Sequence, residues 1–112
     1  MVRLSITLTA ACARDAENLL EGLDFLIPGT RLTRGCIACY AWADADSVVH
    51  YLEDWATEGD IRRRVLSEAF TPLMALVEVA GDAHVEFHFV SQTRGLDYVT
   101  EMRQRAANQP ES

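Results

Sequence analysis

The sequence predicts a single α+β domain in which one four-stranded antiparallel sheet carries helices on one face. Three observations lead to this prediction: short segments with alternating apolar residues, longer segments with apolar residues at helical spacing, and the order in which the two kinds follow each other. The chain has 112 residues, of which 49% are hydrophobic. Both values suit one folded globular domain spanning residues 1–112, with its core in residues 2–90.

The N-terminal part predicts a strand followed by a helix. In residues 2–9, apolar side chains alternate with polar ones, as in a half-buried strand. Apolar residues then recur at helical spacing: Ala16, Leu19, Leu20, Leu23 and Ile27. Because proline lacks a backbone N–H, Pro28 followed by Gly29 predicts a kink or a broken last turn.

The middle of the chain predicts a hairpin. The segments "GCIACYAWA" and "SVVHYLEDWA" suit two strands, and "ADADS" suits the turn that joins them. Cys36 and Cys39 have the C-x-x-C spacing of a redox or metal site. On a regular strand, residues three apart point to opposite faces, so we expect two small buried cysteines instead.

A second helical region follows the hairpin. Thr57 is a candidate N-cap, with Asp60 completing an imperfect capping box. A buried stripe is expected at Ile61, Val65, Ala69 and Leu73. Pro72 should divide this helix in two, and the second piece should end near Gly81.

This region also holds three consecutive arginines. Glu58 and Asp60 lie one turn before Arg62 and Arg64, a spacing that favours ion pairs on a solvated helix face.

The C-terminal part predicts one more strand and a short helix. In "AHVEFHFV", Val85, Phe87 and Phe89 share one face. A helix is expected at about residues 95–106 with Leu96, Val99 and Met102 turned inward, and residues 107–112 should be frayed. The complete order, β-α-β-β-α-β, is the ferredoxin-like arrangement.

Charge and composition narrow the possible partners. The net charge is −7, which argues against nucleic acid or an anionic membrane surface as a partner. No apolar run approaches the roughly 18 residues of a membrane span, and the N-terminus lacks the apolar core of a signal peptide. We therefore expect a cytoplasmic protein, with its three cysteines outside any disulfide framework.

One face of the sheet should be covered by a second copy of the chain. Tyr40, Trp42 and other large residues lie on both faces of the predicted hairpin. A sheet with helices on one face only leaves the other face to solvent or a partner. We therefore expect a homodimer with a two-fold interface.

From residue 2 to residue 90 the chain resembles the antibiotic biosynthesis monooxygenase domain. The segments that carry the resemblance are "RLTRGCIACYAW" and "YLEDWATEGDIRRRVLSEAFTPLM". Their shared features are the Gly35-Cys36 pair, the Glu-x-Trp strand of Glu53 and Trp55, and the late Phe70. The resemblance implies a dimeric α/β barrel with a pocket between the sheet and the helices of each copy.

Family members include cofactor-free monooxygenases that act on quinol or polyketide-like aromatic compounds, and enzymes that degrade haem. Many members carry a histidine about nine residues after the tryptophan, where this chain has Arg64. The haem-degrading branch has an asparagine and a histidine where this chain has Leu4 and Met74. Without a strong axial ligand a haem is poorly held, so we expect no haem.

The candidate catalytic residues are Trp55, Arg64 and Tyr51. Trp55 could form the wall of a pocket with Phe70 and Met74. Arg64, Tyr51, Tyr40 and Trp42 could offer positive charge or hydrogen-bond donors to an anionic substrate. The purely structural alternatives are that Trp55 is an ordinary core residue and that Arg64 only forms an ion pair with Asp60. The candidate substrate-binding residues are Leu4, Ile6, Tyr40, Trp42, Phe70, Met74 and Phe87.

No resident cofactor or metal is expected. The chain has no Gly-rich phosphate loop or nucleotide motif. His50, His84 and His88 share no metal-binding spacing with carboxylates, and His84 and His88 should face the dimer barrel or solvent.

Two functions remain open at this point. The leading hypothesis is a cofactor-independent monooxygenase that oxidises a small aromatic or quinol-like compound. The alternative is a non-catalytic dimer that binds a small apolar molecule or a protein.

Overall fold

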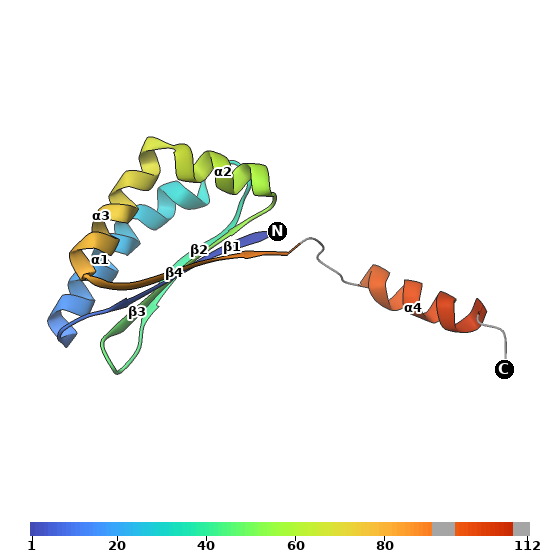
Figure 1. Cartoon of the computed structure of the whole chain (residues 1–112), viewed down its shortest axis with the longest axis horizontal. Helices are drawn as coiled ribbons and strands as arrows, with labels where there is room; N and C mark the ends of the chain where they lie inside the picture. The colour runs from blue at the N-terminus through green and yellow to red at the C-terminus, as the bar shows by residue number, and fades with distance from the viewer. Residues whose placement is uncertain (91–95, 109–112) are drawn as a thin grey trace.

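The computed structural model describes residues 1–90 and 96–108. These described residues form four strands and four α-helices, with a short 3₁₀ helix, η1, after the second α-helix (Figure 1). In chain order they are β1 (Val2–Thr9), α1 (Ala13–Arg31), β2 (Cys36–Ala43), β3 (Val48–Trp55), α2 (Glu58–Leu66), η1 (Glu68–Phe70), α3 (Thr71–Ala80), β4 (Asp82–Phe89) and α4 (Leu96–Asn108).

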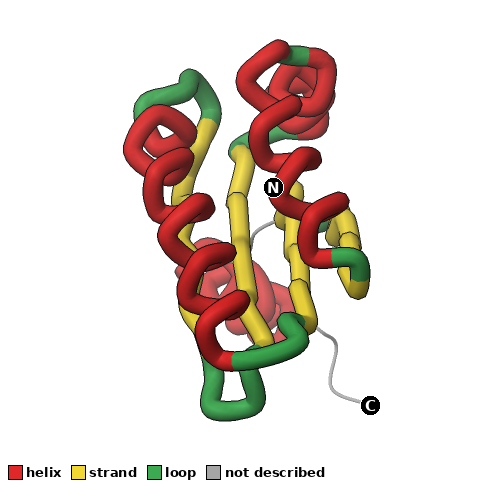
Figure 2. The backbone as a smooth tube through the Cα atoms, turned by 90° about the vertical axis from the view of Figure 1, so that its left-hand side faces the viewer, coloured by secondary structure: helices red, strands yellow, loops and turns green. Residues whose placement is uncertain are grey.

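The strands form one antiparallel sheet in the order β2-β3-β1-β4, which confirms the predicted ferredoxin-like arrangement. Helices α1, α2 and α3 lie over one face of this sheet (Figures 1 and 2). The alternating residues of β1 divide as predicted: the four at even positions from Val2 to Leu8 are buried under the helices. This helix-covered face therefore holds the core, and the opposite face is open in the single chain.

Helix α1 continues past Pro28 to Arg31, so the broken last turn, one of the two predicted outcomes, does not occur. The hydroxyl of Thr30 donates to the carbonyl of Leu26 at 2.9 Å, and the hydroxyl of Thr33 donates to the carbonyl of Gly29 at 3.1 Å. These side-chain bonds serve carbonyls in the last turns, where the end of a helix leaves few backbone donors.

The second helical region divides earlier than predicted. Helix α2 ends at Leu66, η1 follows, and Pro72 stands in the first turn of α3, where a proline is well tolerated. The irregular turn changes the phase of the helix. The predicted stripe is therefore wrong at Ala69, which is exposed. It is also wrong at Val65, which precedes the turn and is exposed because the inward positions of α2 are Ile61 and Arg64. Leu73 is buried as expected.

The start of α2 is as predicted. Thr57 accepts from the backbone N–H of Asp60 at 3.1 Å, and the Asp60 carboxylate accepts from the backbone N–H of Thr57 at 3.2 Å. The capping box is therefore complete, although aspartate replaces the usual glutamate.

A β-bulge changes the geometry of the C-x-x-C segment. Cys36 pairs with Trp55 and Cys39 with Glu53, while Ile37 is the extra residue between them. Residues directly opposite each other lie on the same face, so both cysteines face the helices. The expectation that they diverge was wrong, whereas the expected burial holds fully for Cys39 and partly for Cys36.

Helix α4 lies beyond the end of β4, apart from the other helices (Figure 1). It extends to Asn108, so two residues assigned to the frayed tail are helical; residue 95 and residues 109–112 lie outside the described residues. Val99 and Met102 are exposed, so they do not turn inward as predicted. The side chain of Leu96 is outside what the structure describes.

Candidate functional site

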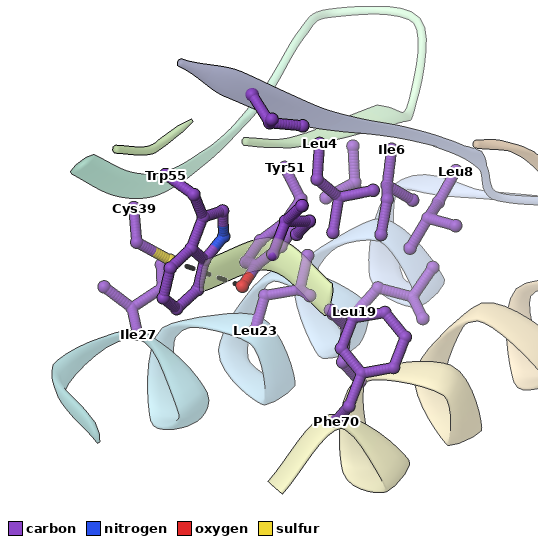
Figure 3. Packing of buried hydrophobic residues seen from close by; sticks show 14 of the residues in the cluster. Leu4, Ile6, Leu8, Leu19, Leu23, Ile27, Cys39, Tyr51, Trp55 and Phe70 are labelled. Carbon is purple, nitrogen blue, oxygen red and sulfur yellow. Dashed lines mark hydrogen bonds between the residues drawn. The ribbon is translucent and has the colours of Figure 1, made fainter. Parts of the chain in front are cut away.

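The three predicted catalytic residues meet around one carboxylate that the sequence analysis did not assign to the site. This carboxylate belongs to Glu53, and Tyr51 and Trp55 flank it on the same face of β3. Figure 3 shows the rings of Tyr51 and Trp55 pointing from the sheet toward the helices. Arg64 reaches the carboxylate from α2.

Glu53 accepts four hydrogen bonds within this cluster. One carboxylate oxygen accepts from the Trp55 indole N–H at 2.8 Å and from Arg64 Nε at 3.2 Å. The other accepts from Arg64 Nη2 at 3.0 Å and from the Tyr51 hydroxyl. The carboxylate thus has a charged partner and two neutral donors, as a buried anion requires.

Burial makes these contacts strong and hard to replace. Glu53 and Trp55 have 0% exposure, Tyr51 has 1% and Arg64 has 4%. Burial lowers the pKa of Arg64, but the hydrogen bonds and charge of Glu53 outweigh it, so the pKa lies above the usual value. The pKa of Tyr51 is raised by burial first and then by the charge of Glu53. At neutral pH Arg64 is therefore a cation and Tyr51 a neutral donor.

Arg64 does not pair with Asp60, so that alternative was wrong. Asp60 instead pairs with Arg63 at 3.2 Å, and Arg62 lies 4.0 Å from Glu58 as expected. The step from Arg63 to Arg64 turns the side chain about 100° around α2, from solvent toward the sheet.

Arg64 also connects the cluster to the molecular surface. Its Nη2 donates to the hydroxyl of Thr30 at 3.3 Å, and its guanidinium carbon lies 5.3 Å from the centre of the Phe70 ring. A cavity of about 280 Å³ begins here, lined by Phe25, Leu26, Gly29, Thr30, Thr33, Arg64, Ala69 and Pro72. We call it the Arg64 cavity.

Trp55 does not form the wall of a pocket. A side chain without exposed surface has no water-sized space against it, and Trp55 is at 0%. Leu4 and Ile6 are equally enclosed, and Phe70 and Met74 pack on the same core. These predicted substrate-binding residues are core residues in the single chain.

The remaining predicted substrate-binding residues lie elsewhere. Tyr40 pairs with Leu52, and Trp42 pairs with His50, on the sheet face opposite the helices. Their rings are 5.7 Å apart, and both side chains are partly exposed. A pocket that contains Trp55 cannot include them, because the sheet lies between. Phe87 is on the helix face but lines a separate groove between β4 and α2.

Other reactive groups contribute little to this site. Burial raises the pKa of the Cys39 thiol to about 11, and that thiol donates to the Tyr51 oxygen at 3.3 Å (Figure 3). Cys39 is therefore protonated at neutral pH and a poor nucleophile. His84 and His88 lie on the open face of β4, as predicted.

Metal-ligand clusters and membrane-spanning helices are both absent from the described part of the chain. Within residues 1–90 and 96–108, no three His, Cys, Asp or Glu side chains are grouped so that they could hold a metal ion. The helices of these residues include none with the length and apolarity needed to cross a membrane.

Glu53 and Thr30 were not predicted as site residues. Glu53 was noted only as part of the resemblance, yet its alternation with Tyr51 and Trp55 places a charge on an otherwise apolar strand face. That pattern was a usable signal. Thr30 had none, because its role depends on the helix continuing past Pro28.

Several solved structures align with this chain over most of its length. A candidate antibiotic biosynthesis monooxygenase from Deinococcus radiodurans aligns with a TM-score of 0.72 and 19% identity, over 85% of this chain and 97% of that one. One from Nitrosomonas europaea aligns with a TM-score of 0.67 and 11% identity, over 82% and 100%. A protein from Pseudomonas aeruginosa gives 0.65 and 23%, over 81% and 94%.

Sequence comparison gives no further match. No family model matches the chain, and no curated protein matches it. Identities below a quarter establish a common fold without a common activity. The chain therefore has the ferredoxin-like fold seen in antibiotic biosynthesis monooxygenase structures.

Proposed function

We propose that the protein is a cofactor-independent monooxygenase that oxidises a small aromatic or quinol-like compound in the Arg64 cavity. The observation that carries the proposal is the position of Arg64 between the buried Glu53 cluster and this cavity. Neighbours in fold that are named as monooxygenases are consistent with it.

The chemistry needs a held anion more than it needs a strong acid or base. For a substrate that loses two hydrogen atoms and gains one oxygen atom, RH₂ and O₂ give RO and H₂O, so the substrate supplies all four electrons. A phenolate donates electrons to oxygen more readily than the neutral phenol does. A fixed cation beside it stabilises both the phenolate and the reduced oxygen species.

Arg64 is suited to this role because its position is fixed. Glu53 and Thr30 engage its Nε and Nη2, and Nη1 takes part in none of these contacts. We assign Nη1 as the donor to the substrate oxygen. Phe25, Leu26 and Pro72 offer apolar surface to an aromatic ring. Phe25 is 85% exposed, so a bound ring would cover it.

Oxygen uptake with a panel of hydroquinones tests the proposal. Wild-type protein should consume oxygen above the rate without protein. Gly29→Leu should abolish most of this uptake, because Gly29 lines the cavity and a side chain there meets no atom within 4 Å of its Cβ. The added side chain therefore occupies the cavity without disturbing the core.

A matched control keeps the test specific. Ala11→Leu adds the same side chain to a different cavity, of about 520 Å³, beside the start of α1. Uptake should be unchanged in this variant. Equal uptake in wild-type and Gly29→Leu protein would place the reaction outside the Arg64 cavity, and no uptake with any compound would count against catalysis.

The second candidate is a non-catalytic module that binds a small apolar molecule. The closed packing around Trp55 favours it, since the family tryptophan meets no open space in the single chain. Calorimetric titration with the same hydroquinones without oxygen separates the two. Binding that Gly29→Leu removes, with no oxygen uptake in air, would favour the binding module.

A further inference from the structure

Helix α4 presents an apolar stripe that its own chain does not cover. Val99, Met102 and Ala106 recur at helical spacing, and all three are exposed. Val99 is 44% exposed and Met102 is 42% exposed. A helix of this length gains most of its stability from packing an apolar face, so such a stripe calls for a partner.

A matching apolar surface lies between α2 and β4. It is lined by Ile61, Val65, Leu66, Phe87 and Phe89, with Glu58 and Arg62 at its rim, and it encloses about 280 Å³. We call it the β4 groove. All eight residues of β4 are exposed, so the helices leave its helix-side residues partly uncovered.

The groove continues to the point where the chain leaves the sheet. A second cavity, of about 400 Å³, shares Glu58 and Phe89 with it and extends to Met1 and Val90. Along the sheet edge the combined surface runs from Phe87 to Val90, a span of about 10 Å. The stripe from Val99 to Ala106 also spans about 10 Å along α4, so the stripe fits the length of the surface.

Helix α4 does not occupy the groove of its own chain. Figure 1 shows it beyond the end of β4, apart from α2 and α3. Phe87 and Phe89 remain 40% and 62% exposed. The helix thus leaves the groove end pointing outward, where a second copy can receive it.

We propose that α4 of one chain packs its Val99–Met102–Ala106 stripe into the β4 groove of a second copy. A two-fold axis makes the exchange reciprocal, so each dimer contains two such contacts. The groove supplies aromatic and aliphatic side chains, and the stripe supplies aliphatic ones. The inference does not depend on the monooxygenase proposal, because the Arg64 cavity and the β4 groove share no lining residue.

Disulfide trapping between two differently tagged chains tests the exchange. Both full-length chains carry Cys12→Ser to remove the exposed native thiol. One chain also carries Met102→Cys and the other Val65→Cys. Refolding them together and oxidising should give a mixed dimer on a non-reducing gel.

The control replaces Met102→Cys by Gln104→Cys, which lies about 200° around α4 from Met102 and should give at least tenfold less mixed dimer. A mixed dimer that depends on Met102→Cys supports the exchange. The absence of a mixed dimer would overturn the exchange. A chain that carries both Met102→Cys and Val65→Cys would also overturn it if its cross-links formed only within one chain.

A second measurement tests the exchange without the Val65→Cys variant, in case that variant folds poorly. Sedimentation of full-length Val99→Glu/Met102→Glu protein should show a dimer dissociation constant at least tenfold higher than wild type. Gln104→Glu should leave it unchanged. An unchanged constant in the double variant would show that the dimer, if formed, uses other surfaces, and would refute the proposal.

Discussion

Removing the charge of Glu53 should expose how strongly the buried cluster depends on it. In Glu53→Gln, the side-chain amide still offers one oxygen to Trp55, but its NH₂ group faces the donors of Arg64 and Tyr51. Arg64, at 4% exposure, becomes a buried cation without a counter-charge. Breaking a buried ion pair in this way costs about 3–5 kcal/mol.

This cost is a large part of the stability of one domain, which is about 5–15 kcal/mol. Equilibrium urea unfolding of wild type, Glu53→Gln, Arg64→Met and the double variant measures it. The double variant removes both charges, so its loss should be smaller than the sum of the two single losses by about 1–3 kcal/mol.

An exposed pair provides the control. Glu58→Gln breaks the contact with Arg62, in which the side chains are 69% and 73% exposed. It should produce no measurable change, since exposed ion pairs contribute little. Additive losses in the double variant, or a Glu53→Gln loss as small as that of Glu58→Gln, would refute the description of Glu53 and Arg64 as a coupled buried pair.

Three other predictions concern the backbone and a buried thiol. Gly29→Ala should stabilise the protein by about 0.5–1 kcal/mol in urea unfolding, because alanine is the better helix former and its Cβ meets no atom within 4 Å. Gly35→Ala should destabilise it more than Gly81→Ala does: both glycines have positive φ, but at Gly35 a Cβ would stand 2.3 Å from the Asp60 carboxyl carbon and disturb the α2 cap. A smaller loss at Gly35 would contradict this close approach. Folding raises the pKa of Cys39 from 9.0 to about 11, so the folded state holds this proton more tightly than the unfolded state does. The free energy of unfolding should therefore fall as the pH rises from 9 to 11. In Cys39→Ala the urea midpoint should fall less over this range, and an identical fall in both proteins would contradict the raised pKa.

The elements were predicted correctly where the spacing of apolar residues matched the positions that are buried. The alternation in residues 2–9 placed β1 correctly, and the helical spacing from Ala16 to Ile27 placed α1. Errors arose where one local irregularity shifted the phase. The turn at η1 exposed Ala69, and the bulge at Ile37 brought Cys36 and Cys39 to one face. Neither irregularity has a distinct composition.

The candidate site was predicted in part. Trp55, Tyr51 and Arg64 were named together, and the structure brings them together. Glu53, at the centre of these residues, was missed because hydrophobic periodicity treats a charged residue as an interruption of an apolar face. A charged residue on such a face can instead be buried with a counter-ion. Tyr40 and Trp42 were assigned to the pocket by residue type, while strand alternation places them on the other face.

The Glu53 cluster also limits how this protein can change during evolution. Neither Glu53 nor Arg64 can be replaced alone without leaving a buried charge, so substitutions at the two positions should appear as pairs among its homologues. An Arg64 to histidine exchange would be an intermediate that keeps a cation only at lower pH. Lineages that carry an apolar residue at position 64 should have lost the acid at position 53, and with it the hydrogen bonds that orient Tyr51 and Trp55.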